Sequence, residues 1–323
     1  ISAAVKCVES TGIAVDWESV QVGEDARKKF GTELPKDALI SIRKNKVALK
    51  GPVTTPIGTG FRSVNVRLRQ ELELFANVRP IKLIPGIKSK YKDIDIVIIR
   101  ENLEDLYIGI EYDKGKFRGL PSDAAVSLKV ISEKNSKRIA EFAFKYALEN
   151  KRKKITCVHK ANILKKTDGM FLDISKNVSK NFSKIQFEDM IVDSMAMQLV
   201  VKPENYDILL CPNLYGDILS DLCGGLVGGL GVIPSVNIGE NAAVFEPVHG
   251  SAPKYKGKNK VNPTAAILAG VMMLRHLGEE EGANRIEKAV FRVIKSGRNL
   301  TYDLNKDKHV GTKEMTNAII KRI

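Results

Sequence analysis

Histidine and cysteine are scarce in this chain, and their scarcity limits which metals and covalent links it can hold. The 323 residues include only four histidines, so a histidine-rich metal site is not indicated. The four cysteines, Cys7, Cys157, Cys211 and Cys223, show no CxxC spacing, which argues against zinc ligation and disulfides. Cys157 and Cys211 stand in apolar runs, so we expect buried free thiols in a reducing compartment such as the cytoplasm or the mitochondrial matrix.

Two sequence signals that would place the chain in other classes are also missing. No apolar run approaches the roughly 18 residues of a membrane-spanning helix. No G-x-G-x-x-G fingerprint follows a strand, and GGLVGGLG at 224–231 lacks that context, so an ordinary Rossmann site is not indicated. The chain begins at Ile1 rather than at a methionine and opens as a helix, so we expect an N-terminal segment to precede it.

Negative charge is in the minority, because 52 lysines and arginines face 38 aspartates and glutamates and give a net charge of +14. Nucleic-acid-binding proteins gather such charge in patches with interleaved aromatic residues. Here the only dense run is KRKK at 151–154, which reads as a loop before a strand. We therefore expect no specific nucleic-acid partner, and a general enrichment in lysine or a polyanionic small substrate accounts for the charge.

Strand-like and helix-like segments alternate along the chain. Short apolar runs predict strands, and longer amphipathic runs such as 136–150 predict helices between them. Asn262 and Pro263 mark the start of a late helix, and Gly297 marks the end of the next one. The alternation predicts an α/β fold with a largely parallel sheet. The predicted strands are residues 47–51, 93–100, 155–160, 187–193 and 206–212.

Charged and polar residues stand where these predicted strands end. Arg100, Lys160 and Asp193 each end a strand, and the last strand leads directly to Asn213 and Asp217. Because ligands of parallel α/β sheets collect at the carboxyl ends of the strands, we expect these side chains to form a site. Carboxylate oxygens suit a hard cation such as Mg²⁺ or Mn²⁺ rather than zinc.

The segment NLYGDILSDLCGGLVGGLG predicts a helix with two aspartates on one face. Asp217 and Asp221 are four residues apart, which places them one above the other. Two carboxylates this close repel each other unless a cation joins them. Every fourth residue from Leu214 to Leu226 is apolar, so we expect this stripe to be buried and the aspartates to lie at its edge.

Two further segments carry groups that suit anionic ligands. Ser63, Asn65 and Arg69 fall near the start of an amphipathic helix, where a hydroxyl, an amide and a guanidinium can bind an anion, and Arg79 follows. The loop EPVHGSAPKYKGKNKVNP combines lysines and a tyrosine with glycine and proline before a helix, which suits a phosphate group.

Several long segments, in order along the chain, resemble the β-decarboxylating dehydrogenases, the family of isocitrate and isopropylmalate dehydrogenases, and most resemble its isocitrate members. The resemblance covers essentially the whole chain. The segments are GPVTTPIGTGFRSVNVRLRQELELFANVRP, RENLEDLYIGIE, VHKANILKKTDGMF, NLYGDILSDLCGGLVGGLG and EPVHGSAPKYKGKNKVNPTA. The resemblance implies the α/β fold of that family rather than a Rossmann fold. It further implies a large, coenzyme-binding domain of residues 1–74 and 228–323, a small domain of 75–104 and 133–227, and a clasp-like segment, 105–132, that helps to form a homodimer.

The resemblance also implies a reaction, the Mg²⁺- or Mn²⁺-dependent oxidative decarboxylation of isocitrate to 2-oxoglutarate. The implied metal ligands are Asp217, Asp221 and, from the partner subunit, Asp193. The implied acid–base pair is Tyr107 and Lys160, with the lysine also coming from the partner. The implied substrate ligands are Ser63, Asn65, Arg69, Arg79 and Arg100, and several arginines are sensible for a substrate with three carboxylates.

The coenzyme that the resemblance implies is NADP in preference to NAD. NAD-dependent members place an aspartate and an apolar residue where this chain has Lys254 and Tyr255, and Tyr302 and Lys306 also resemble the NADP-dependent type. An aspartate would accept a hydrogen bond from the ribose 2′-hydroxyl and repel a 2′-phosphate, whereas a lysine reverses that preference. The remaining implied coenzyme contacts are Thr55, Glu246, His249, Gly250 and Asn262.

Two departures and three alternatives accompany this interpretation. The glycine-rich strand expected before Ile1 is absent, and the stretch from Tyr107 to Ser132 is short for a full clasp. Related 2-hydroxy acids, homoisocitrate or 3-isopropylmalate, are alternative substrates, although the S-x-N-x-x-x-R pattern at 63–69 is polar as in isocitrate enzymes. A non-catalytic subunit of a hetero-oligomer is a further alternative, against which the retained catalytic residues argue.

Overall fold

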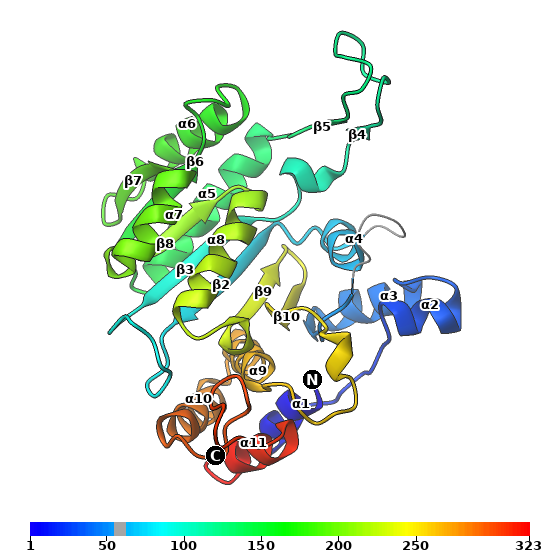
Figure 1. The fold of residues 1–323 in the computed structure, drawn as a ribbon, viewed down its shortest axis with the longest axis vertical. Coiled ribbons are helices and arrows are strands. Elements are labelled where there is room, and N and C mark those ends of the chain that lie inside the picture. Colours follow the sequence, from blue (N-terminus) through cyan, green and yellow to red (C-terminus); the bar gives the residue numbers. More distant parts are fainter. Residues whose placement is uncertain (55–62) are drawn as a thin grey trace. The chain divides into compact units, whose positions relative to one another are not determined.

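The computed structural model describes residues 1–54 and 63–323, which divide into two compact units. The first unit holds Ile1–Leu74, Val78–Asp95 and Asp221–Ile323, and the second holds Phe75–Asn77 and Ile96–Ser220. Both units combine strands with helices (Figure 1), so the predicted α/β fold is confirmed. The finer division into a large domain, a small domain and a clasp-like segment stays a prediction.

The first unit contains four strands in the order β1-β10-β9-β2. β1 is parallel to β10, but β10 is antiparallel to β9, which departs from the parallel sheet of an ordinary Rossmann fold. Its strands are β1 (Val47–Leu49), most of β2 (Ala76–Lys82), β9 (Pro234–Ile238) and β10 (Ala243–Pro247). Its helices are α1 (Ser2–Glu9), α2 (Glu24–Phe30), α3 (Lys36–Asn45), α4 (Val64–Glu71), α9 (Thr264–His276), α10 (Glu280–Lys295) and α11 (Thr312–Ile320), with short 3₁₀ turns η3 (Leu230–Val232) and η4 (Pro253–Tyr255).

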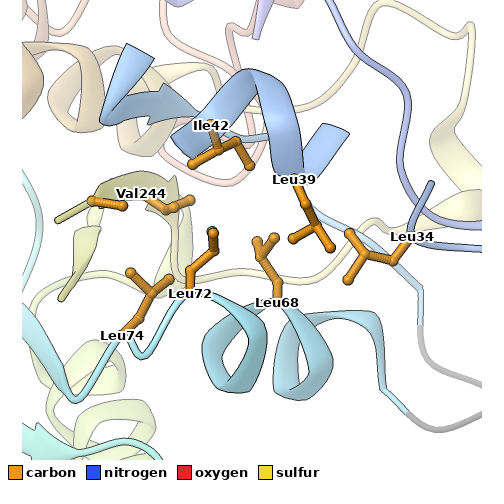
Figure 2. Packing of buried hydrophobic residues seen from close by; sticks show 8 residues of the cluster. Leu34, Leu39, Ile42, Leu68, Leu72, Leu74 and Val244 are labelled. Atoms are coloured by element: carbon orange, nitrogen blue, oxygen red, sulfur yellow. The ribbon is translucent and has the colours of Figure 1, made fainter. Parts of the chain in front are cut away.

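A leucine-rich cluster fixes α3 and α4 in this unit (Figure 2). Leu39 and Ile42 of α3 pack with Leu68 of α4 and with Val244 of β10, and all of these side chains are buried. Burying a leucine or isoleucine side chain stabilises the fold by about 1.5–3 kcal/mol. The cluster therefore holds α4, the helix that carries Arg69, against the strand that carries Glu246.

The second unit is built on four strands that are all parallel, in the order β3-β8-β6-β7. The apolar runs of β3, β6 and β8 are buried, as the central strands of a parallel sheet require, whereas the edge strand β7 is only partly covered. α5 packs on β6 and β8. The strands are β3 (Asp95–Glu101), β6 (Lys154–His159), β7 (Gln186–Ile191) and β8 (Ile208–Cys211). The helices are α5 (Glu133–Glu149), α6 (Thr167–Ser179), α7 (Val192–Val201) and, shared with the first unit, α8 (Asn213–Leu226), with 3₁₀ turns η1 (Asp105–Ile108) and η2 (Pro203–Asn205).

All five predicted strands are present within about two residues of their predicted bounds, and the four cysteines are buried and free, as expected for Cys157 and Cys211. The sequence did not predict β2, β9 or β10. It also did not predict the antiparallel ribbon of β4 (Glu111–Tyr112) and β5 (Val126–Ser127), which projects from the rest of the second unit (Figure 1). In the part of the chain that is described, no helix is both long and apolar enough to cross a membrane.

The prediction for the buried side of α8 is wrong. The stripe that begins at Leu214 is not the covered face, because Ile218 is 56% exposed, whereas Leu219 and Cys223 are fully buried. The buried side is made of small and polar residues as well, such as Gly216, which periodicity of apolar residues does not detect. The apolar stripe beside the aspartates is therefore a surface that the described chain leaves partly uncovered.

Candidate active site

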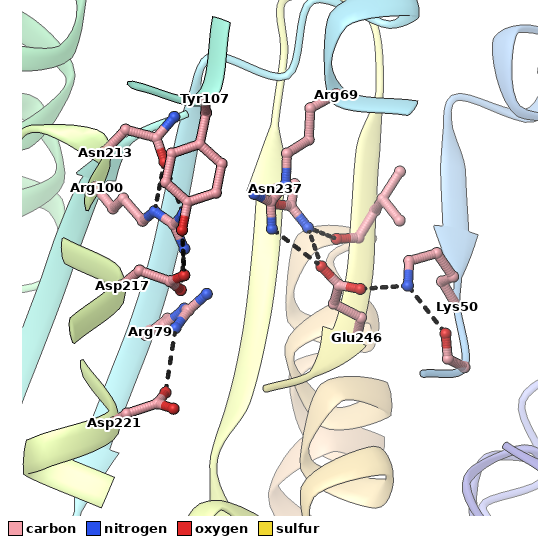
Figure 3. A network of polar contacts seen from close by, with 12 residues as sticks. Lys50, Arg69, Arg79, Arg100, Tyr107, Asn213, Asp217, Asp221, Asn237 and Glu246 are labelled. Carbon is pink, nitrogen blue, oxygen red and sulfur yellow. Dashed lines mark hydrogen bonds and ion pairs between the residues drawn. The ribbon is translucent and has the colours of Figure 1, made fainter. Parts of the chain in front are cut away.

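In the second unit, Arg100 at the end of β3 organises a compact polar cluster (Figure 3). Its guanidinium is 1% exposed and donates to Asn213 Oδ1 through Nε at 2.9 Å and Nη2 at 2.6 Å. Nη1 forms an ion pair with Asp217, one turn further along α8. The Tyr107 hydroxyl donates to the other oxygen of Asp217 at 2.5 Å, and its ring lies 5.0 Å from the Arg100 guanidinium carbon. The structure thus brings together three predicted site residues, Arg100, Tyr107 and Asp217.

Two backbone features make this cluster possible. Gly216 lets α8 approach β3 closely, because a Cβ at this position would lie 2.7 Å from both Cβ and Cγ of Arg100. Asp105 adopts a left-handed backbone with φ of 71°, which is strained for a residue other than glycine. Its carboxylate accepts hydrogen bonds from the backbone N–H of Leu106 and Leu214, both at 2.9 Å, so it ties η1, which carries Tyr107, to the start of α8.

Lys160 and Asp193, the other predicted pair of the second unit, contact each other directly. The ammonium of Lys160 forms an ion pair with Asp193 on α7 and lowers the pKa of that carboxyl through its hydrogen bond. The backbone N–H of Lys160 donates to the buried carboxylate of Asp168 at 2.7 Å. Because the two side chains lie in the same unit and contact each other, a neighbouring molecule that binds one of them would also meet the other.

In the first unit, Arg79 and Asp221 form a looser pair. Arg79 on β2 is 5% exposed, and its Nη1 lies 3.9 Å from Asp221 Oδ1 (Figure 3). The Asp221 side chain is 58% exposed, so its carboxylate faces solvent while the guanidinium does not. A buried cation beside an accessible carboxylate is an arrangement that suits anions and metals alike.

Glu246, a predicted coenzyme contact, lies in a buried ionic network of the first unit (Figure 3). Lys50 Nζ lies 2.5 Å from Oε2, Arg69 Nη2 lies 3.9 Å from Oε1, and Asn237 Nδ2 donates to Oε1 at 2.7 Å. Burial alone would raise the pKa of Glu246, but Lys50 and Arg69 outweigh it and hold the pKa at about 2. The sequence did not identify Lys50, which follows β1 without any motif of its own.

Ser63 and Asn65 lie where the sequence predicted, at the start of α4. Ser63 occupies the position that precedes the helix, and Asn65 follows in its first turn. The Oδ1 of Asn65 is buried and has no hydrogen-bond partner among the described residues. Since buried polar atoms are normally satisfied, this oxygen suits a ligand that donates a hydrogen bond. Thr55 lies outside the described residues.

The predicted coenzyme residues Lys254, Tyr255 and Tyr302 come together in the first unit, with Lys260 among them. The two rings are 5.8 Å apart, and Lys260 Nζ lies 5.2 Å from the Tyr255 ring and 4.5 Å from the Tyr302 ring. Lys254 Nζ lies 5.0 Å from the Tyr255 ring. The hydrogen bond between the two hydroxyls lowers the pKa of Tyr255 and raises the pKa of Tyr302 to about 12. The result is a cationic group stacked on two aromatic rings.

The remaining predicted coenzyme residues have more varied surroundings. His249 bonds through Nδ1 to the carbonyl of the next residue, Gly250, at 2.9 Å. Asn262 is buried, donates to Asp303 at 2.9 Å and accepts the backbone N–H of Thr264 at the start of α9. Lys306 is exposed in the loop after Tyr302. The roles assigned to all these residues stay predictions.

The carboxylates present fit a divalent cation only in part. Asp217 and Asp221 provide hard oxygen donors with side-chain exposures of 39% and 58%, which suits Mg²⁺ or Mn²⁺. Across residues 1–54 and 63–323, however, no group of three or more histidine, cysteine, aspartate or glutamate side chains could hold a metal ion. A complete site would need further oxygen ligands, from substrate, water or a neighbouring chain.

Comparison with known proteins shows which family the chain belongs to. Residues 1–319 match the model of the isocitrate/isopropylmalate dehydrogenase family. A Drosophila melanogaster protein, "Probable isocitrate dehydrogenase (NAD) subunit alpha, mitochondrial", is 47% identical over 328 residues, which cover 100% of this chain and 84% of that protein. The isocitrate dehydrogenase (NADP) of Archaeoglobus fulgidus is 41% identical over 368 residues, covering 100% and 89%. The crystal structure of isocitrate dehydrogenase from Methylococcus capsulatus matches with a TM-score of 0.96 and 51% identity, covering 99% of this chain and 94% of that one. The chain belongs to the isocitrate/isopropylmalate dehydrogenase family.

Proposed function

We propose that this chain oxidises and decarboxylates isocitrate to 2-oxoglutarate and CO₂, with hydride transfer to a nicotinamide coenzyme. The observation that carries the proposal is the cluster in which buried Arg100 forms an ion pair with Asp217 and the Tyr107 hydroxyl donates a hydrogen bond to the same carboxylate. A cation, an accessible carboxylate and a neutral phenol at one strand end supply charge recognition, an oxygen ligand for a metal and a proton donor.

The polar character of the assigned substrate residues favours isocitrate over 3-isopropylmalate and other apolar analogues. Arg69, Arg79 and Arg100 are each less than 9% exposed, and isocitrate has three carboxylates to offer. Asn65, with its buried acceptor oxygen, and Ser63 add polar groups where an isopropyl tail would need apolar ones. The same retention of arginines and acid–base residues argues against a non-catalytic subunit.

The residues of the chain divide the chemistry between them. Arg69, Arg79 and Arg100 hold the substrate carboxylates. Lys160 of the partner subunit accepts the proton of the C2 hydroxyl as hydride leaves C2 for the coenzyme, so that a carbonyl forms at C2. The bond from C3 to the departing carboxylate then breaks, CO₂ leaves, and Tyr107 delivers a proton to C3. Mg²⁺ or Mn²⁺ would be held by Asp217, Asp221 and Asp193 of the partner subunit, and when bound it supplies Lewis-acid stabilisation of the C2 oxygen.

A homodimer completes the proposed site. Asp193, Met197 and Val201 are spaced four residues apart on α7, so one face of this helix carries a carboxylate beside apolar side chains that are 54% and 57% exposed. Ile218 on α8 adds to the exposed apolar surface of the second unit. A second copy covering such a surface would bring Lys160 and Asp193 into its neighbour's site, and a hetero-oligomer with a related chain would use the same surface.

We further propose NADP as the preferred coenzyme, with NAD as the alternative. The lysines stacked on Tyr255 and Tyr302 suit the 2′-phosphate of NADP, which would be repelled by an aspartate at position 254. The names of similar isocitrate dehydrogenases weigh against this preference, since most of them, like the Drosophila protein, are NAD types, whereas the Archaeoglobus protein is an NADP type. We also propose a reducing compartment, the cytoplasm with the mitochondrial matrix as the alternative, because the four cysteines are free.

The activity is tested by following reduced coenzyme with isocitrate, 3-isopropylmalate and homoisocitrate, each with NAD and NADP, with and without Mg²⁺. We expect turnover of isocitrate that requires the metal. Tyr107→Phe should lower kcat by about 100-fold or more, because it removes the proton donor. Tyr112→Phe is the matched control, since Tyr112 is an exposed tyrosine on the β4–β5 ribbon. Absence of isocitrate turnover under every condition overturns the proposal.

The coenzyme preference is tested separately. Lys254→Asp combined with Tyr255→Ile should shift the NADP/NAD ratio of kcat/KM toward NAD by at least about tenfold, which corresponds to about 1.4 kcal/mol. Lys258→Asp, an exposed charge reversal in the same loop, is the control and should change the ratio less. An unchanged ratio in the double variant rules out these residues as the determinants.

A further inference from the structure

Lys129 lies in a buried ionic cluster of the second unit that the proposed reaction does not use. Its side chain is 13% exposed, and its ammonium lies 2.7 Å from Asp168 Oδ1 and 3.6 Å from Asp105 Oδ1. Both aspartates are fully buried. The ammonium also lies 4.3 Å from the centre of the Tyr215 ring, whose hydroxyl hydrogen-bonds Asp168. One cation thus joins two buried carboxylates that would otherwise repel each other.

The first of these carboxylates holds the element that carries Tyr107. Asp105 accepts the N–H of Leu106 within η1 and the N–H of Leu214 in α8, and its own N–H donates to Val130 O at 2.8 Å, next to Lys129. Its left-handed backbone is the kind of strained conformation that persists only when surrounding contacts demand it. The charge of Lys129 is one of those contacts, so it bears on where the Tyr107 hydroxyl lies.

The second carboxylate holds the element that carries Lys160. Asp168 Oδ2 accepts the N–H of Lys160, directly after β6, while Oδ1 faces Lys129. The loop is closed further by the N–H of Leu164, which donates to the Lys160 carbonyl at 2.8 Å. Removing the cation would leave Asp168 buried beside a second negative charge, and the backbone that starts the Lys160 loop would have to adjust.

We propose that Lys129 is a positioning residue for both members of the acid–base pair, Tyr107 and Lys160. The inference rests on the proposed function, in which Lys160 acts in the partner's site. Under that arrangement a single buried lysine sets the geometry of two different active sites, its own through Asp105 and the neighbouring one through Asp168. Neither contact touches substrate, so its effect is on turnover rather than on binding.

Steady-state kinetics of the homodimer give the first test. Lys129→Met should lower kcat by about 10- to 100-fold, since small misplacement of catalytic groups has effects of that size, with KM for isocitrate changed less than about threefold. Lys129→Arg keeps the cation and should recover most of kcat. Lys288→Met, which removes an exposed lysine on α10 of the first unit, is the matched control and should behave as wild type.

Mixed dimers give the decisive test. One chain carries Tyr107→Phe and the other Lys160→Met, with different affinity tags, so that one of the two sites receives an intact Tyr107 from the second chain and an intact Lys160 from the first. This dimer should be active although each parent homodimer is not. Adding Lys129→Met to the first chain alone, and separately to the second chain alone, should each lower kcat by about tenfold. If Lys129→Met chains do not assemble, Lys129→Gln replaces them, because its amide can still donate to Asp168 and so favour folding. The same loss of kcat is expected, since glutamine lacks the charge that joins Asp105 and Asp168.

The outcomes separate this inference from the function on which it rests. A loss of kcat from only one of the two placements, or from neither, overturns the two-site role of Lys129 and leaves the proposed reaction intact. If the mixed dimer with intact Lys129 in both chains is inactive while the wild-type dimer is active, the sharing of sites is overturned, and the two-site role of Lys129 with it. A wild-type chain without isocitrate turnover overturns the proposed function itself, and with it this inference.

Discussion

Glu246 in the first unit and Glu101 in the second are carboxylates of similar burial, 6% and 1% exposed, with opposite charge preferences. Burial by itself would raise the pKa of both carboxyls. At Glu246 the cations Lys50 and Arg69 outweigh burial, and the pKa is about 2. At Glu101 the oxygens accept the backbone N–H groups of Leu103 and Glu104, the charge of Glu104 adds to burial, and the pKa is about 7. In this protein the partner of a buried carboxylate, rather than its depth, decides its charge.

The largest expected effect comes from removing the cation at Glu246. Lys50→Met should lower the free energy of unfolding at neutral pH by about 3–5 kcal/mol, because it leaves the buried charge of Glu246 with the more distant Arg69 and the neutral amide of Asn237. Unfolding in urea measures the change. The double variant Lys50→Met/Glu246→Gln should recover part of the loss, since the unpaired charge is then absent. A loss below about 1 kcal/mol in the single variant would contradict this account.

A smaller effect is expected from the protonation of Glu101, which should make the free energy of unfolding on the order of 3 kcal/mol higher at low pH than at high pH. Its pKa is about 7 in the folded protein against an ordinary 4.5, so between these values the folded state binds a proton that the unfolded state has lost. The stabilisation is complete below pH 4.5, declines as pH rises through that window and is gone above pH 7. Glu101→Gln should remove this slope, as measured by unfolding at several pH values. Parallel curves for the variant and the wild type would show that folding does not raise the pKa of Glu101.

The smallest effect on stability is expected at the exposed pair of Lys160 and Asp193. Asp193 is 64% exposed, so water and salt screen the attraction, and Asp193→Asn should leave the thermal unfolding midpoint of the protein unchanged within error. The same variant should lose turnover if Asp193 is a metal ligand. A clear drop in the unfolding midpoint would show that this pair stabilises the fold as the Glu246 network does.

Much of the fold and part of the site could be predicted because their signals are local. Apolar runs identified the parallel strands of the second unit, and the residues that follow such strands meet at one edge, which is why Arg100 and Asp217 were expected together. Lys50 and Lys129 could not be found this way. Their carboxylate partners are distant in sequence, and an isolated lysine carries no pattern that distinguishes a buried cation from a surface one.

The prediction of which side of α8 is buried was wrong for a related physical reason. Periodicity locates apolar side chains but not what covers them, and here small and polar residues face β3 while the apolar stripe is left partly exposed. The prediction of an α/β fold survived this error because the helix itself, from Asn213 to Leu226, depends on local sequence rather than on which face is covered.

The close approach of Gly216 to Arg100 also constrains how this protein can change over time. A side chain at position 216 has no room while a long residue stands at position 100, since its Cβ would lie 2.7 Å from the Arg100 stem. A substitution of Gly216 therefore meets a steric barrier for as long as Arg100 is present, whereas Gly216 places no such barrier on a shorter residue at position 100. Lineages that give up the arginine would be free to lose the glycine, whereas those that keep the arginine inherit both, so the two positions should vary together among relatives.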